Sequence, residues 1–162
     1  MKIFAVLLCM LLLCGCTADV FETVGDGGNA PVMAQSAQLL LELPEDAAAQ
    51  TMEGASGKLY FCDDYEIMVE TLASGDLKRT VKTLTGFDLE DLALVQTKRC
   101  GVPCVEGAWS AAGENGDQVG RFLILDDGAY HYCVSVMAAA DRGGACADSW
   151  QKLLESAKLA ET

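Results

Sequence analysis

His131 is the only histidine in the chain, which makes it the first residue to consider for catalysis or metal binding. It lies in the run Tyr130–Met137, whose alternation predicts a strand. Cys133 then faces the same side, about 7 Å away along that strand (two residues at roughly 3.3 Å each). A nucleophilic cysteine–histidine pair requires hydrogen-bond contact. The spacing therefore favours a structural histidine in or at the edge of a sheet, and a single histidine excludes metal sites built from several histidines.

Acidic residues gather in three predicted turns. These groups are Asp63-Asp64, Asp88 with Glu90 and Asp91, and Asp126-Asp127. Loop carboxylates can bind calcium, but none of the groups has the spacing of an ordered calcium loop. Turn chemistry accounts for them, because Asp side chains hydrogen-bond to nearby backbone. We therefore predict no metal, no cofactor and no catalytic residue, since a Gly-x-Ser-x-Gly elbow and a Walker-type loop are also missing from the sequence.

Five cysteines lie beyond the N-terminal segment. They are Cys62, Cys100, Cys104, Cys133 and Cys146. Cys100 and Cys104 flank a predicted hairpin tip, where opposed residues lie about 5.5 Å apart, within disulfide reach. We predict a disulfide between these two and leave the other three unassigned, because an odd count leaves one thiol free or paired between molecules. One CxxxC is not the double pair typical of a zinc site.

The elements that must position these residues are mostly strands. Hydrophobic runs and alternation predict strands over Gln38–Leu43, Lys58–Cys62, Tyr65–Leu72, Leu92–Lys98, Val105–Ala111, Val119–Leu125 and Tyr130–Met137. Asp127-Gly128 is a strong hairpin signal.

Two helices complete the prediction. The first is capped by Ser74, carries an apolar stripe of Leu77, Val81 and Leu84, and ends at Gly86. Its basic residues Lys78, Arg79 and Lys82 predict a solvated face, with a partner-docking face as the alternative. The second covers about residues 147–159, and Gly143-Gly144 supplies the break before it. The order predicts an α+β domain, with an antiparallel sheet of about six to seven strands and both helices packed on it.

The N-terminal segment has the features of an export signal. Lys2 precedes an apolar run from Ile3 to Leu13, which is too short for a bilayer span of roughly 20 residues. The run ends in Leu13-Cys14-Gly15-Cys16, which resembles the bacterial lipobox, with Cys14 at its tolerant position. The resemblance implies cleavage before Cys16 and a lipid on that cysteine. An ordinary signal peptide cut elsewhere is the alternative.

These features predict three parts. Residues 1–15 are a lipoprotein signal peptide, residues 16–36 the lipidated cysteine with a flexible Gly-, Ala- and Asp-rich tether, and residues 37–162 one globular α+β domain. The net charge of −13 opposes binding to nucleic acid and anionic head groups. We therefore expect the membrane to be a partner only through the lipid on Cys16, at the cell membrane or an outer membrane.

The domain, over about residues 37–160, resembles the PsbP-like fold, known from an extrinsic photosystem protein and a nuclear-import factor. The cues are Leu43-Pro44, the segment Leu84–Phe87, Val119–Arg121, the segment Asp126–Tyr132 and a closing helix with Trp150. The resemblance implies binding or assembly and transfers no catalytic residue.

Two functions follow. The first is a non-catalytic binding or assembly module of the cell envelope, not an enzyme, with an unknown envelope protein or ligand as its partner. Its predicted binding face consists of Tyr60, Phe61, Trp109, Tyr130 and His131. The alternative is an envelope enzyme of unknown reaction that uses His131 and turn carboxylates.

Overall fold

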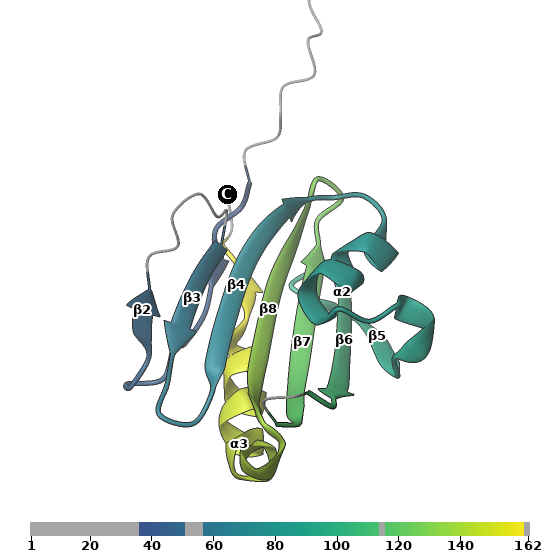
Figure 1. Ribbon diagram of the computed structural model, residues 1–162. Coiled ribbons are helices and arrows are strands. Elements are labelled where there is room, and N and C mark those ends of the chain that lie inside the picture. The colour runs from purple at the N-terminus through teal and green to yellow at the C-terminus, as the bar shows by residue number, and fades with distance from the viewer. Residues whose placement is uncertain (1–35, 51–56, 114–115, 161–162) are drawn as a thin grey trace, which may run out of the picture. The chain divides into compact units, whose positions relative to one another are not determined.

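The computed structural model describes residues 36–50, 57–113 and 116–160. Its elements are β1 (Leu39–Leu40), β2 (Ala48–Gln50), β3 (Gly57–Phe61), β4 (Glu66–Ala73), α2 (Leu77–Thr85), η1 (Leu89–Asp91), β5 (Leu94–Arg99), β6 (Val102–Ala111), β7 (Gln118–Asp126), β8 (Tyr130–Ala139), α3 (Ala140–Ser156) and β9 (Lys158–Leu159). Within the described residues, seven strands form one antiparallel sheet in the order β2-β3-β4-β8-β7-β6-β5. Figure 1 shows this sheet with α2 in front and α3 behind. The predicted α+β fold with a mid-chain and a C-terminal helix is confirmed.

Tight turns set the register of the meander from β5 to β8. Cys100 and Gly101 join β5 to β6 with φ of 53° and 80°, and two positive φ angles are what a type I′ hairpin turn requires. Between β7 and β8, the carboxylate of Asp127 accepts hydrogen bonds from the backbone N–H groups of Ala129 and Tyr130. Gly128 takes a φ of 89° there, as the Asp127-Gly128 signal predicts.

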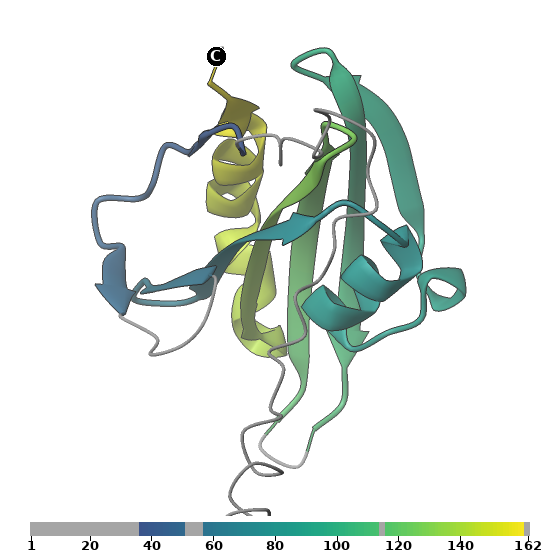
Figure 2. The same cartoon turned by 90° about the horizontal axis from the view of Figure 1, so that it is seen from above.

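The central strands β7 and β8 are buried on both sides of the sheet. We call its two sides the α3 face and the α2 face, after the helix that packs on each; Figure 2 shows the helices on opposite sides. Core residues of the α3 face are Ile67, Leu123, Leu125, Tyr132, Val134 and Val136, under Trp150, Leu153 and Leu154 of the helix. Those of the α2 face are Val105, Phe122, Ile124 and Cys133, under Val81 and Leu84. Burial of alternate residues on opposite sides explains why β7 and β8 are apolar at consecutive positions.

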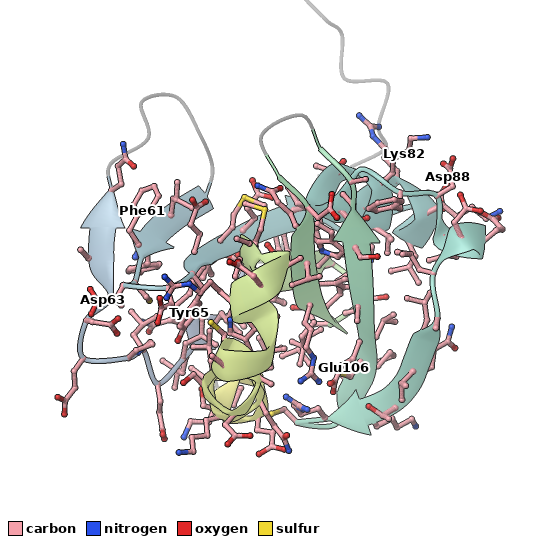
Figure 3. All side chains as sticks on the ribbon, turned by 60° about the horizontal axis from the view of Figure 1, so that its bottom comes forward. Phe61, Asp63, Tyr65, Lys82, Asp88 and Glu106 are labelled. Atoms are coloured by element: carbon pink, nitrogen blue, oxygen red, sulfur yellow. The ribbon has the colours of Figure 1, made fainter. Side chains whose placement is uncertain are left out.

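Helix α2 follows its predicted stripe but begins later than predicted. Asp76, not Ser74, is the N-cap, and its side chain accepts from the Lys78 N–H at 3.0 Å. Gly86 ends the helix with a φ of 79°, as predicted. The basic residues lie on the solvent side, where Lys78 pairs with Glu90 and Lys82 with Asp88. Figure 3 labels Lys82 and Asp88.

Two boundary predictions were wrong. Only Leu39 and Leu40 of the predicted strand 38–43 form a strand, and they pair with β9 outside the large sheet. Helix α3 begins at Ala140, so Gly143 and Gly144 lie inside it instead of breaking the chain before it. Gly143 lies against β7: a Cβ there would be 2.4 Å from Cγ2 of Val119. The missing side chain therefore permits close packing of helix on sheet.

The two neighbouring glycines allow a matched test of that packing. Gly143→Ala is expected to lower the free energy of unfolding by about 1–2 kcal/mol, because overpacking at Val119 outweighs the gain in helix propensity. Gly144→Ala serves as the control, since a Cβ there meets nothing within 4 Å, and its stability should equal or exceed that of the wild type. Urea denaturation measures both, and equal stabilities for the two variants would contradict the packing argument.

Candidate binding groove

The five residues of the predicted binding face do not share one face. Tyr60 and Tyr130 pack against the core of the α3 face. Phe61, Trp109 and His131 belong to the α2 face, since side chains alternate along each strand. His131 is only 1% exposed. The prediction of a single aromatic surface was therefore wrong.

His131 is held by hydrogen bonds inside the protein. Its Nδ1 lies 2.8 Å from Oγ1 of Thr80 on α2, and its Nε2 lies 3.5 Å from Oγ of Ser74 and 3.7 Å from Oδ2 of Asp126. A cavity of about 490 Å³ opens beside Ser74 and Thr80, but His131 does not line it. The Cys133 thiol contacts the backbone carbonyl of His131, at 3.6 Å. These contacts join β8 to α2 and to the segment after β4, which fits a structural histidine.

The predicted Cys100–Cys104 disulfide is absent from the structure, in which both cysteines are free. The prediction took residues 100–104 as the hairpin tip, with its two cysteines opposed. The turn is only Cys100-Gly101, so Thr97 lies opposite Cys104. Cys100 is exposed and Cys104 is buried on the α3 face.

The three unassigned cysteines are also free and differ in surroundings. Burial, together with the nearby Glu70 carboxylate, raises the pKa of Cys133 to about 12, so its thiol is unreactive near neutral pH. Cys62 lies in the turn between β3 and β4, where its N–H donates to the Tyr65 carbonyl at 2.9 Å. Cys146 lies on α3, and its thiol is 3.9 Å from the carbonyl of Asp64 in that turn. Burial raises the pKa of both thiols.

A groove of about 430 Å³ lies on the α3 face, between the sheet and the segment Ala37–Leu43, which we call the strap. Figure 2 shows the chain running from β1 around to β2, clear of the sheet. One wall consists of strap residues, with Leu39, Leu41 and Leu43 as the alternating set. The other consists of β3 and β4 residues, namely Lys58, Tyr60, Val69 and Thr71. We take this strap groove as the candidate binding site, because its volume lies in the range of about 300–1,000 Å³ typical of ligand sites and leucines line one of its walls.

The strap is attached to the domain at several points. The Tyr132 hydroxyl accepts from the Ala37 N–H at 2.8 Å and donates to Oδ2 of Asp127 at 2.7 Å. Leu39 and Leu40 pair with β9. The Glu42 N–H donates to Oγ of Ser156 at the end of α3, at 3.0 Å. Bonds at both ends hold the strap wall in place over the sheet.

The ionisation of the Tyr132–Asp127 pair reflects this geometry. Burial and the Asp127 carboxylate raise the pKa of Tyr132 to about 12. Partial burial opposes ionisation of Asp127, but hydrogen bonds from the Tyr132 hydroxyl and from backbone N–H groups outweigh it and lower the pKa of Asp127. The pair thus favours a neutral phenol that donates to a charged carboxylate, which is a strong form of hydrogen bond.

Sequence reasoning missed the strap groove because residues 38–43 were predicted as a regular strand of the sheet. Lys58, Val69 and Thr71 were assigned to strands but not to a site. Their common face follows from alternation along β3 and β4. The strap opposite them is positioned by contacts with residues more than 90 positions away, which no local pattern encodes.

The described residues contain no group of three histidine, cysteine or acidic side chains placed to hold a metal ion. In the same part of the chain, no helix is long and apolar enough to cross a membrane.

Comparisons with known proteins identify the fold. No protein-family model and no curated protein matches this chain in sequence. Cyanobacterial PsbP (CyanoP) from Synechocystis is similar in structure, with a TM-score of 0.53 and 12% identity over 84% of this chain and 100% of CyanoP. LpqN of Mycobacterium tuberculosis, described as involved in cell envelope biogenesis, has a TM-score of 0.53 and 13% identity, over 78% of this chain and 85% of LpqN. A structure from Bacteroides thetaiotaomicron has a TM-score of 0.52 and 12% identity over 76% of this chain, which spans only 45% of that protein. The chain therefore has a PsbP-like fold.

Proposed function

We propose that this protein is an exported bacterial lipoprotein, anchored through Cys16, whose domain is a non-catalytic binding module of the cell envelope. The observation that carries the proposal is the strap groove, a concave site of about 430 Å³ with leucines along the strap wall. Hydrogen bonds from Ala37 and Glu42 hold that wall in place. The likeness to LpqN, described as involved in cell envelope biogenesis, supports a role in the envelope. The enclosure of His131 by Thr80 and Ser74 argues against the alternative enzyme, since a substrate would have to displace these contacts.

The anchor is tested with two neighbouring cysteines. Cys16→Ser should release the protein from bacterial membranes, because the lipid chains supply the membrane affinity, at about 0.8 kcal/mol for each buried methylene. Cys14→Ser is the matched control and should remain membrane-bound. Fractionation with immunoblotting measures both, and a Cys16→Ser protein that stays uncleaved in the membrane would refute anchoring through this cysteine.

The groove is tested with 1-anilinonaphthalene-8-sulfonate, a fluorescent probe with an apolar ring system and an anionic sulfonate. We expect the mature chain with Cys16→Ser to bind the dye. Val69→Phe should reduce the affinity for the dye at least tenfold, because Val69 lines the groove and the larger side chain fills it. Val95→Phe is the control: Val95 lies on β5, is 60% exposed and does not line the groove. Thr71→Phe repeats the test should Val69→Phe disturb the fold, which circular dichroism checks. Equal dye binding by the Val95 variant and a folded groove variant would remove the groove as the site.

A further inference from the structure

The strap groove differs in charge from the rest of the protein. The chain has 24 acidic and 11 basic residues. Among the described residues, the groove is lined by one charged side chain, Lys58, and by no carboxylate. A positive charge in this groove, within a strongly acidic protein, favours an anionic ligand.

Lys58 lies on the wall of the groove that β3 and β4 form. It lies on β3 opposite Val69 of β4, so the two side chains project from the same face of the sheet, the α3 face. The residue is exposed, and among the described residues no carboxylate forms an ion pair with it. A lysine in such a position covers apolar surface with its aliphatic stem and keeps its ammonium group in water.

From this arrangement, and resting on the proposed function, we infer that the strap groove binds a single-chain fatty carboxylate. The alkyl chain lies between the strap leucines and Val69, and the carboxylate faces the Lys58 ammonium. Burial of the chain provides the affinity, at about fourfold for each methylene removed from water. The exposed ion pair contributes only about threefold to fivefold, so its effect is on charge selection.

The experiment compares two amphiphiles of opposite charge, each built on twelve carbons in a row. Dodecanoate and dodecyltrimethylammonium are titrated below their micelle concentrations against the dye-bound mature chain with Cys16→Ser. Displacement of 1-anilinonaphthalene-8-sulfonate at low salt reports the affinity of each. We expect dodecanoate to bind about threefold to fivefold more tightly, and the ratio to shrink in 1 M salt because ions screen an exposed pair. The net charge of −13 favours the cation, so a preference for the anion must arise locally.

Charge reversal sharpens the test. Lys58→Glu should invert the preference strongly, and Lys58→Gln should leave a weak preference for the cation, because the negative net charge then acts alone. Lys152→Glu makes the same change at an exposed site on α3 outside the groove, and should preserve the preference for dodecanoate. Octanoate should bind more weakly than dodecanoate, and vesicles of phosphatidylglycerol should not displace the dye.

The outcomes separate this inference from the proposed function. The fatty-carboxylate inference would be overturned if the wild type bound the two ligands equally and Val69→Phe bound neither. The groove would then remain the binding site. Dye displacement by vesicles but not by dodecanoate would overturn it in favour of a bilayer lipid. If neither the dye nor any chain bound the folded protein, the proposed binding function itself would fall.

Discussion

Replacement of Trp150 by alanine is expected to lower the free energy of unfolding by about 3–5 kcal/mol, a large part of the stability of a domain of this size. Trp150 is 3% exposed and packs from α3 onto the α3 face. Its ring meets Tyr65 edge to face, with centroids 6.2 Å apart and planes at 72° (Tyr65 is labelled in Figure 3). Alanine would leave a cavity where the helix crosses the sheet.

Trp150→Phe separates ring packing from the polar atom of the indole. Among the described residues, the buried Nε1 of Trp150 has no hydrogen-bond partner. Phenylalanine keeps most of the apolar contact and removes that unpaired donor, so its expected cost is below about 1.5 kcal/mol. Guanidinium denaturation at neutral pH compares both variants with the wild type. If Trp150→Ala and Trp150→Phe were equally stable, the aromatic contact would not hold α3 on the sheet.

The parts of the fold that sequence predicts are those with short-range causes. Asp127-Gly128 sets a turn between neighbouring strands, and Gly86 ends α2 where a positive φ is required. The stripe of Leu77, Val81 and Leu84 places that helix on the sheet. Each signal acts over a few residues, so the order of elements from β4 to α3 could be predicted without tertiary information.

The candidate site was predicted less well, although part of the error was avoidable. Tyr60 and Phe61 are adjacent in one strand, as are Tyr130 and His131, and adjacent strand residues point to opposite faces. A single aromatic surface was therefore inconsistent with the predicted strands themselves. The Cys100–Cys104 pairing failed for a related reason, because a two-residue turn shifts the register and opposes Cys104 to Thr97.

The strap groove has no comparable local signal. The strap is attached through Ala37 to Tyr132 and through β1 to β9. These contacts join residues that are far apart in the sequence. The apolar residues of the strap fit a strand of the sheet equally well by pattern alone. What distinguishes the two arrangements is the pairing partner, which only the tertiary structure provides.

Tyr132→Phe is expected to lower the free energy of unfolding by about 1.5–3 kcal/mol at pH 7, the range for hydrogen bonds to charged groups. The change leaves the Asp127 carboxylate and the Ala37 N–H without their shared partner. Because the bond to Ala37 fixes one end of the strap, binding of the dye in the groove should weaken as well. Urea denaturation and dye titration measure the two effects, and a variant with wild-type values for both would show that this bond does not position the strap.

The pH dependence of stability tests the same pair through Asp127, whose pKa is lowered in the folded state. A carboxyl group of this kind stabilises the fold fully above its unfolded pKa, and the stabilisation is lost progressively below about pH 5 as the pH falls toward the folded pKa. Asp127→Asn should therefore reduce the free energy of unfolding at pH 7 and make it fall less steeply in acid. Asp148→Asn changes an exposed carboxylate of α3 and is the control, whose stability should depend on acid pH as the wild type does. At alkaline pH the dependence of stability on pH has the opposite sign. The raised pKa of Tyr132 stabilises the fold below about pH 10, and this stabilisation is lost as the pH rises toward 12. Tyr132→Phe removes that loss only in part, since burial also raises the pKa of Tyr65 to about 12. If the stability of Asp127→Asn fell in acid as steeply as that of the wild type, another group would cause the acid sensitivity. The charge of Asp127 would then not strengthen the bond through which Tyr132 holds the strap.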